Sequence, residues 1–200
     1  MTSDFVMPFS VIILAAGASR RMGSPKALLP WGKRTVLEHL IAVWKEANAS
    51  EIIVVHDSGN VALGTEMDRL GIRHRITNMN PEDGMMSSIR CAADANIRTP
   101  LVAISLVDQP QIPAELIRVL VTAAANESGT IWQPQHKGKH GHPVVFPTAE
   151  FLKIRKTSAA TLREFLRDRQ SSRRFLTWKN DDVLIDLDTP EDYEQAKPKE

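Results

Sequence analysis

The chain has 200 residues, of which 42% are hydrophobic and 24% charged, and its formal net charge is +1 at pH 7. This composition fits a globular chain with a sizeable core, and we expect residues 1–200 to form one domain. The near-zero charge gives no reason to expect a nucleic acid or an anionic membrane surface as partner. One cysteine excludes an internal disulfide and suits a reducing cytoplasm, and the apolar run near the start is too short for a signal peptide or a membrane span.

The first part of the chain alternates between strand-like and helix-like patterns. An apolar run predicts a buried strand at 10–15, and apolar residues at helical spacing predict a helix at 35–48. A strand at 51–56, a short helix at 60–71 and a less buried strand at 72–77 follow. This order is typical of βαβ units, in which the strands run parallel.

The same alternation continues through the middle of the chain. We expect a helix at 85–96, a fully buried strand at 101–107 and a helix at 113–126. Two later strands are expected at 130–135 and 142–147. The whole pattern predicts an α/β fold, a three-layer α/β/α Rossmann-like arrangement around a mainly parallel sheet.

The last third of the chain departs from this rhythm. It begins with a cationic amphipathic helix expected at 157–170. Short strands are predicted at 173–178 and 182–187, and a final helix at 189–196.

A basic, glycine-bearing loop follows the first predicted strand, in the sequence ILAAGASRRMGSPKALLPWG at 13–32. It leaves the carboxyl end of that strand, where open α/β sheets bind ligands. Gly17 and Gly23 allow consecutive N–H groups to converge on an anion. The cations around the same concavity are Arg20, Arg21 and Lys26. The loop therefore fits a polyphosphate, with a flexible surface loop bearing scattered cations as the alternative.

Asp108 ends the buried strand predicted at 101–107. A carboxylate at this place needs a partner because an unpaired buried charge is expensive. Mg²⁺ is the natural partner, since it takes oxygen ligands and shares them with phosphates. The alternative is that Asp108 caps the helix that follows it.

Asp186 and Asp188 are two residues apart on a predicted strand, so both are expected to project from one face. Either one could supply a second carboxylate to the metal. The alternative is a helix start with Thr189 as cap, Pro190 first and Asp192 third, in which Asp188 simply complements the helix dipole.

Two further segments contain candidate contacts for a nucleotide. Gly84 precedes a predicted helix whose first turn contains Ser87 and Ser88, an arrangement suited to an anion or a ribose. Ordinary helix N-terminal chemistry has equal weight there. His56 ends the second predicted strand and is a candidate for the wall of a base pocket.

The loop and four later motifs together resemble a known family. The segment at 14–40 resembles the signature of nucleotidyltransferases with the nucleotide-diphospho-sugar transferase fold, and most closely the MobA-like molybdenum cofactor cytidylyltransferases. NPEDGMMSSIRCA (80–92), VDQPQI (107–112), GHPVVF (141–146) and LIDLDTPEDY (184–193) occur in the family's order. The resemblance implies Mg²⁺-dependent transfer of CMP from CTP to the phosphate of molybdopterin, with release of pyrophosphate.

The resemblance also assigns roles to individual residues. Arg21, Lys26 and Asp108 are the implied catalytic residues, and Asp108 and Asp188 the implied metal ligands. Arg20 falls at a variable position, and His142 of the Gly-His-Pro triplet is implied on the acceptor side. The expected nucleotide-binding residues are Leu14, Ala15, Ala16, Gly17, Ser19, Arg21, Lys26, His56, Gly84 and Ser88.

The choice of base and acceptor stays open at this point. The resemblance implies that the Ala15-Ala16-Gly17 form of the loop accompanies cytosine and a Gly-Gly form guanine, and the added methyl group of Ala16 would leave less room for a purine, which favours CTP over GTP. The segment 151–170 lacks the glycine-containing motif of the family, so a sugar phosphate or polyol phosphate is an alternative acceptor. A maturation protein that binds without turnover is a third hypothesis, disfavoured by the combination of Lys26 with Asp108. The first hypothesis implies a molybdenum hydroxylase as the partner that uses the product.

Overall fold

A computed structural model describes residues 7–17, 19 and 21–198, and a mixed eight-stranded sheet lies at its centre. Along the sheet the order is β10-β7-β9-β6-β1-β4-β5, with β8 paired to β7. The strands are β1 (Phe9–Leu14), β4 (Glu51–Asp57), β5 (Arg75–Asn78), β6 (Leu101–Leu106), β7 (Ile131–His136), β8 (Lys139–His140), β9 (Val144–Pro147) and β10 (Arg173–Thr177).

Most of the strand pairs are parallel, as the βαβ pattern predicts. β1 lies between β4 and β6 and pairs in parallel with both, β4 pairs in parallel with β5, and β10 with β7. β9 runs antiparallel to its two neighbours, β6 and β7. The prediction of a mainly parallel α/β sheet is therefore confirmed.

Helices surround the sheet. The α-helices are α1 (Val36–Glu46), α2 (Val61–Arg69), α3 (Met85–Ala93), α4 (Ala114–Asn126), α5 (Thr148–Phe151), α6 (Leu162–Arg167) and α7 (Pro190–Ala196). Short 3₁₀ turns and a small hairpin complete the described chain: η1 (Lys26–Leu28), η2 (Pro81–Asp83), η3 (Leu152–Lys156), η4 (Gln170–Ser172), η5 (Asp182–Leu184), β2 (Pro30–Trp31) and β3 (Arg34–Thr35). Within the described ranges, no helix has the length and apolar character needed to cross a membrane.

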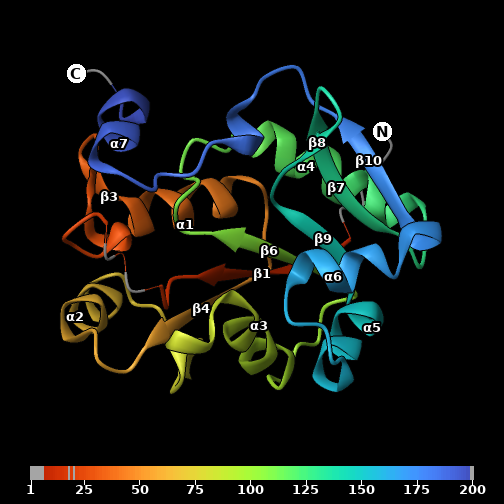
Figure 1. Cartoon of the computed structure of the whole chain (residues 1–200), viewed down its shortest axis with the longest axis horizontal. Helices are drawn as coiled ribbons and strands as arrows, with labels where there is room; N and C mark the ends of the chain where they lie inside the picture. The colour runs from red at the N-terminus through yellow and green to blue at the C-terminus, as the bar shows by residue number, and fades with distance from the viewer. Residues whose placement is uncertain (1–6, 18, 20, 199–200) are drawn as a thin grey trace, which may run out of the picture.

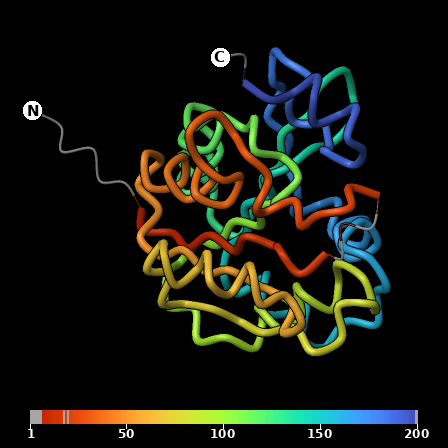
Figure 2. The backbone as a smooth tube through the Cα atoms, turned by 90° about the vertical axis from the view of Figure 1, so that its left-hand side faces the viewer, coloured from red at the N-terminus to blue at the C-terminus, as the bar shows by residue number. Residues whose placement is uncertain are grey.

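Two hydrophobic cores lie on opposite faces of the sheet. Every residue of β1 is buried, and successive side chains alternate between the faces. Val11 and Ile13 pack into the core formed with α1 and α4, whereas Ile12 and Leu14 pack into the core formed with α3, α5 and α6. Figure 1 shows these helices on the two sides of β1 and β6, and in Figure 2 the red β1 runs through the middle of the molecule.

Two predictions in the last third of the chain are wrong. The expected strand at 182–187 pairs with no strand of the described chain; it consists of η5 and an extended segment held by side chains of the loop after β6. The expected helix at 157–170 is shorter, because α6 begins only after Thr161, whose hydroxyl caps it by accepting a hydrogen bond from the Glu164 N–H at 3.1 Å.

Candidate active site

The carboxyl ends of the central strands meet at one edge of the sheet. The Ala15 N–H donates to the Val55 carbonyl at 2.8 Å, and the Val107 N–H donates to the Leu14 carbonyl at 3.3 Å. The loop after β1 and the loop after β6 therefore leave the sheet side by side, and Asp108 lies two residues beyond the end of β6.

Local turns in the first loop position Lys26. Ser19 adopts a positive φ of 46°, its hydroxyl accepts a hydrogen bond from the Lys26 N–H at 3.1 Å, and its carbonyl accepts one from Met22 at 2.9 Å. Gly23 has a φ of 69°, a conformation that favours glycine. A Cβ at Gly17 would meet no protein atom within 4 Å, so the protein itself does not require glycine there. Arg20, a predicted cation of this loop, lies outside the described residues.

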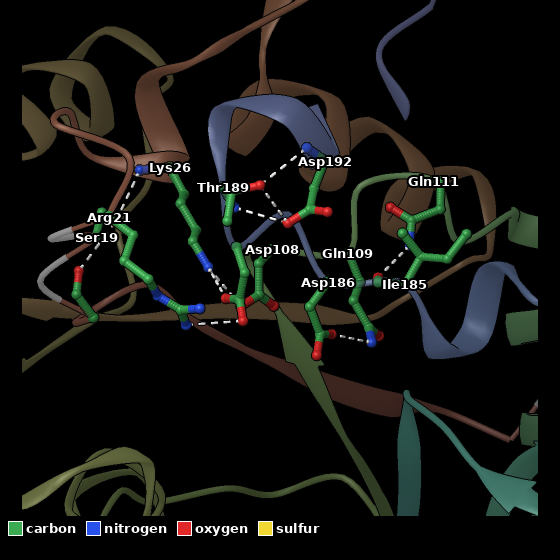
Figure 3. A network of polar contacts seen from close by, with 12 residues as sticks. Ser19, Arg21, Lys26, Asp108, Gln109, Gln111, Ile185, Asp186, Thr189 and Asp192 are labelled. Carbon is green, nitrogen blue, oxygen red and sulfur yellow. Dashed lines mark hydrogen bonds and ion pairs between the residues drawn. The ribbon is translucent and has the colours of Figure 1, made fainter. Parts of the chain in front are cut away.

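A lysine and two carboxylates form the centre of the site, as Figure 3 shows for Lys26 and Asp108. The Lys26 ammonium donates to Asp188 Oδ1 at 2.8 Å and to Asp108 Oδ2 at 3.1 Å. Only 12% of the Lys26 side chain is exposed, so water screens these contacts weakly. The exposed Arg21 guanidinium donates to Asp188 Oδ2 at 2.9 Å. Residues far apart in the sequence are thus joined in one cluster.

The contacts favour the charged forms of Lys26 and Asp188. The hydrogen bond from Lys26 lowers the pKa of Asp188, assisted by the positive charge of Arg21. Burial alone would lower the pKa of Lys26, but attraction to Asp108 and hydrogen bonds to both carboxylates outweigh it, and the net result is a raised pKa. At neutral pH the cavity edge therefore presents the ammonium group of Lys26 beside the ionised carboxylate of Asp188.

The donor atoms at this edge fit a divalent cation. Asp108 Oδ2 receives the Lys26 hydrogen bond, whereas Asp108 Oδ1 is buried and has no hydrogen-bond partner among the described residues. Asp188 provides the second carboxylate. The described residues contain no cluster of three or more His, Cys, Asp or Glu side chains arranged to hold a metal. A Mg²⁺ ion here would complete its octahedral shell with phosphate oxygens and water, as is usual for this ion.

Two glutamines tie the segment containing Asp188 to the loop after β6. The Gln111 amide donates to the carbonyls of Asp182 at 2.8 Å and Ile185 at 2.7 Å. The Gln109 amide donates to Asp186 Oδ1 at 2.8 Å, and Figure 3 shows the carboxylate of Asp186 directed to this amide. Burial and the nearby carboxylates raise the pKa of Asp186. Asp186 and Asp188 thus point to different partners, because the segment between them is not the strand that the sequence predicts.

Helix α7 begins directly after this segment with the expected cap. Thr189 and Asp192 form a capping box, with Pro190 in the first turn. This cap engages the side chain of Asp192, which leaves the carboxylate of Asp188 for Lys26 and Arg21. The predicted helix cap is therefore confirmed, whereas the role of Asp188 as a metal ligand stays a prediction.

A cavity opens beside the cluster and contains most of the predicted site residues. The predicted residues in its lining are Leu14, Ala16, Gly17, Ser19, Arg21, Lys26, Gly84, Ser88, Asp108 and Asp188. Pro81, Met85, Leu106 and Val107 also line it. The sequence gives no signal for Pro81, Leu106 and Val107 as lining residues, whereas Met85 is an apolar residue of the motif at 80–92 and was expected near the wall of the pocket.

Two predicted nucleotide contacts do not line this cavity. Ala15 is buried beside it, with 5% of its surface exposed. His56 Nε2 lies 3.3 Å from the Thr77 hydroxyl and His56 Nδ1 lies 3.1 Å from the Asp57 carbonyl, so the ring is directed to its own strand and to β5. Ser88 does line the cavity, and its buried hydroxyl accepts a hydrogen bond from the Asn78 amide at 2.9 Å.

His142 lies in a second cavity that shares Gly84 and Met85 with the first. Desolvation lowers the pKa of His142 to about 4, so its imidazole is neutral at pH 7. Its Nδ1 atom is buried and has no hydrogen-bond partner among the described residues. The structure thus separates His142 from the lysine–carboxylate cluster but places it in an adjoining space.

Comparison with protein-family models gives one match. The model described as the MobA-like NTP transferase domain covers residues 11–179, which include the first loop, Asp108 and the segment through β10.

Curated relatives have names for two nucleotide specificities. A molybdenum cofactor guanylyltransferase of Xanthomonas euvesicatoria pv. vesicatoria is 38% identical over 114 residues, which span 57% of this chain and 54% of that protein. The molybdenum cofactor cytidylyltransferase of Escherichia coli K12 is 26% identical over 190 residues, which span 93% of this chain and 94% of that protein.

Solved structures share the fold. A nucleotidyl transferase from a Methanothermobacter species has a TM-score of 0.80 at 17% identity and covers 95% of this chain and 96% of that chain. The protein Rv0371c of Mycobacterium tuberculosis, in a complex with manganese, has a TM-score of 0.74 at 23% identity and covers 94% of this chain and 97% of that chain. These likenesses establish the fold of the chain.

Proposed function

Since the chain belongs to the MobA-like NTP transferase family, we propose that it transfers CMP from CTP to the phosphate of molybdopterin and releases pyrophosphate. The observation that supports this most is the cluster of Lys26, Asp108 and Asp188 at the edge of one cavity. A cation between carboxylates, at the edge of a cavity that the glycine-bearing first loop also lines, suits a metal-bound triphosphate. The proposal includes a cytoplasmic reaction whose product is used by a molybdenum hydroxylase.

In the proposed reaction an oxygen of the acceptor phosphate attacks the α-phosphorus of the nucleotide. A new P–O bond forms, the bond from the α-phosphorus to the bridging oxygen breaks, and pyrophosphate leaves with that electron pair. When bound, Mg²⁺ supplies Lewis-acid chemistry, withdrawing charge from the phosphorus. Asp108 and Asp188 would hold it, and Lys26 and Arg21 neutralise negative charge on the triphosphate.

Lys26 has two sets of partners in this scheme. In the ligand-free site its ammonium offsets the charges of Asp108 and Asp188, which prevents two neighbouring carboxylates from repelling each other. Lys26 also lines the cavity, so the same side chain reaches phosphate oxygens when a nucleotide is bound. The family supports an enzyme of this class, and the cluster supplies the charges that the chemistry needs.

CTP is the proposed donor because of Ala16. This residue lines the cavity, and only 3% of its surface is exposed, so its methyl group is packed in place at the wall. A rigid methyl group there leaves less room for a purine than glycine would. The curated relatives include both cytidylyl and guanylyl enzymes, so the test compares the two nucleotides directly.

The test is pyrophosphate release by the purified protein with CTP or GTP, with and without Mg²⁺ and molybdopterin. We expect release only with all components and a higher kcat/KM for CTP than for GTP. Ala16→Gly should lower the ratio of kcat/KM for CTP to kcat/KM for GTP by about tenfold, which is the discrimination that a small steric difference in a pocket typically gives. Turnover with ribitol phosphate or glucose 1-phosphate, and none with molybdopterin, would show that the acceptor is a polyol or sugar phosphate and not molybdopterin. Nucleotide binding without any pyrophosphate release would contradict the enzyme itself.

A further inference from the structure

The second cavity is strongly basic, and this charge has no role in the scheme above. Cationic side chains in its lining come from three separate segments: Lys139, Arg163, Arg167 and Arg173. Asp83 is the carboxylate among the lining residues. The linings of this cavity and of the first share Gly84 and Met85, so the two cavities lie next to each other.

Arg173 is the most firmly held of these cations. Its guanidinium donates to Gln133 Oε1 at 2.7 Å and to the Leu166 carbonyl at 3.3 Å, and lies 4.9 Å from the centre of the Phe175 ring. Its Nε atom is buried without a hydrogen-bond partner among the described residues. The side chain is therefore fixed in position while one of its donors stays unused.

The charge of Arg173 also has no paired carboxylate in the part of the chain that the structure describes. Within the described residues it forms no ion pair, in contrast to Lys26 with its carboxylates and to Arg169, which lies 3.8 Å from Glu150. Burial lowers the pKa of Arg173. Burying a guanidinium without an anion is unfavourable, so a bound anion is the expected compensation.

The positive charges in this cavity also affect the neighbouring imidazole of His140. His140 stacks on Phe175 with ring centres 4.0 Å apart. Burial is the main cause of its lowered pKa, and the positive charges of Arg173 and Arg163 lower it further. Cations from α6, β8 and β10 thus line one cavity, and those of α6 and β10 act on the same imidazole.

We propose that this basic cavity binds the end of the acceptor that is remote from its reacting phosphate, and that this end has a negative charge of its own, bound by Arg173. This inference rests on the proposed transfer reaction, since it assumes that the acceptor phosphate lies at the lysine–carboxylate cluster. It narrows the substrate class to acceptors with a second anionic group, and it disfavours monophosphates of neutral sugars and polyols.

The kinetic test replaces Arg173 by leucine and measures KM for molybdopterin and for CTP separately. A lost charge-assisted contact should raise KM for molybdopterin by about ten- to a hundredfold and change KM for CTP by less than about twofold. Arg173→Lys should restore part of the loss, because it returns the charge without the guanidinium fork. A purely structural role would not separate the two KM values.

Arg174→Leu is the matched control. Arg174 is the next residue on β10, is exposed, lies 3.2 Å from Glu127 and does not line the cavity. Its substitution should leave both KM values unchanged. If Arg173→Leu fails to fold, Arg163→Leu tests the same cavity from the exposed surface of α6 and should raise KM for molybdopterin several-fold. Unchanged KM for molybdopterin in a folded Arg173→Leu or Arg163→Leu protein overturns the inference.

A second measurement does not depend on turnover. Inorganic phosphate is titrated by calorimetry into Lys26→Ala protein, in which the first site lacks its central cation. Binding that is lost in Lys26→Ala/Arg173→Leu supports the anion subsite, and equal binding in the two proteins contradicts it. Should wild-type protein transfer no nucleotide to molybdopterin, the proposed function fails, while this titration still decides whether the basic cavity binds an anion.

Discussion

Lys26 contacts carboxylates from two distant segments of the chain and is itself largely buried. Its contacts with Asp108 and Asp188 cross 82 and 162 positions of sequence. Removing one partner from such a group leaves the others with uncompensated charge. The behaviour of the empty site toward metal ions therefore depends on this one side chain.

Lys26→Met should make the nucleotide-free protein bind Mn²⁺ more tightly, although it should impair turnover. Without the ammonium group, Asp108 and Asp188 lose their intramolecular counter-charge. A divalent cation then binds these carboxylates without competition from Lys26. We expect an increase in affinity of about tenfold, measured by electron paramagnetic resonance titration of Mn²⁺. Weaker Mn²⁺ binding in this variant would show that Lys26 does not share the carboxylates with the metal.

His142 should make the protein sensitive to mild acid. Desolvation lowers its pKa from 6.5 to about 4, so its stabilising contribution is complete above pH 6.5 and is lost as the pH falls toward 4. The free energy of unfolding should drop by up to about 3 kcal/mol across this window on account of His142. Urea unfolding at pH 7 and pH 4.5 measures the drop, and His142→Asn should reduce it. An identical pH dependence in the variant would contradict this assignment.

At the residue scale the sequence identifies the charged centre but not the direction of every side chain. Lys26, Asp108 and Asp188 were predicted, and the structure brings them within hydrogen-bond distance. Asp186 and His56 are held instead by Gln109 and Thr77, which are contacts that no local pattern reveals. Such orientations depend on tertiary neighbours, so a single sequence does not determine them.

At the scale of elements, the turn before β9 supports the segment that contains Asp188. The Gly141 N–H donates to the Pro134 carbonyl at 2.9 Å, and the His142 N–H donates to the Val183 carbonyl at 3.3 Å. A Cβ at Gly141 would lie 2.1 Å from that same carbonyl oxygen. Glycine at this position is therefore required by close packing against η5, a physical reason for the first residue of the Gly-His-Pro triplet.

Gly141→Ala should displace η5 and the aspartates that follow it. We expect a loss of about 1–3 kcal/mol in the free energy of unfolding and weaker binding of Mn²⁺. Gly64→Ala in α2 is the control, since a Cβ there meets nothing within 4 Å and alanine should stabilise the helix by roughly 0.5–1 kcal/mol. Equal stability of the Gly141→Ala and wild-type proteins in urea unfolding would contradict the role given to this contact.

The strand wrongly predicted at 182–187 shows where a local hydrophobic pattern fails. Its short apolar run resembles a strand, but β10 pairs with β7, and the segment is instead hydrogen-bonded to Gln111 and to the Asp108 carbonyl. A strand needs a partner strand with unpaired backbone groups. Whether such a partner is available depends on the arrangement of the whole sheet.

At the scale of the whole molecule, topology creates the site. β1 and β6 are parallel neighbours, so the loop containing Lys26 and the loop containing Asp108 leave the sheet at the same edge. The βαβ alternation was sufficient to predict that both loops leave at the carboxyl ends of parallel strands, but not that β6 is the neighbour of β1. The antiparallel insertion of β9 between β6 and β7 is likewise a long-range arrangement that local patterns do not encode.

The central claim is that Lys26 and Asp108 act on the same bound metal–triphosphate, and a double-mutant cycle on kcat/KM for pyrophosphate release tests it most directly. Lys26→Ala and Asp108→Asn should each reduce kcat/KM by about a hundredfold or more. The double variant should lose little beyond either single variant, because the two residues work as one unit. Losses that multiply in the double variant, or wild-type turnover in either single variant, would contradict the claim.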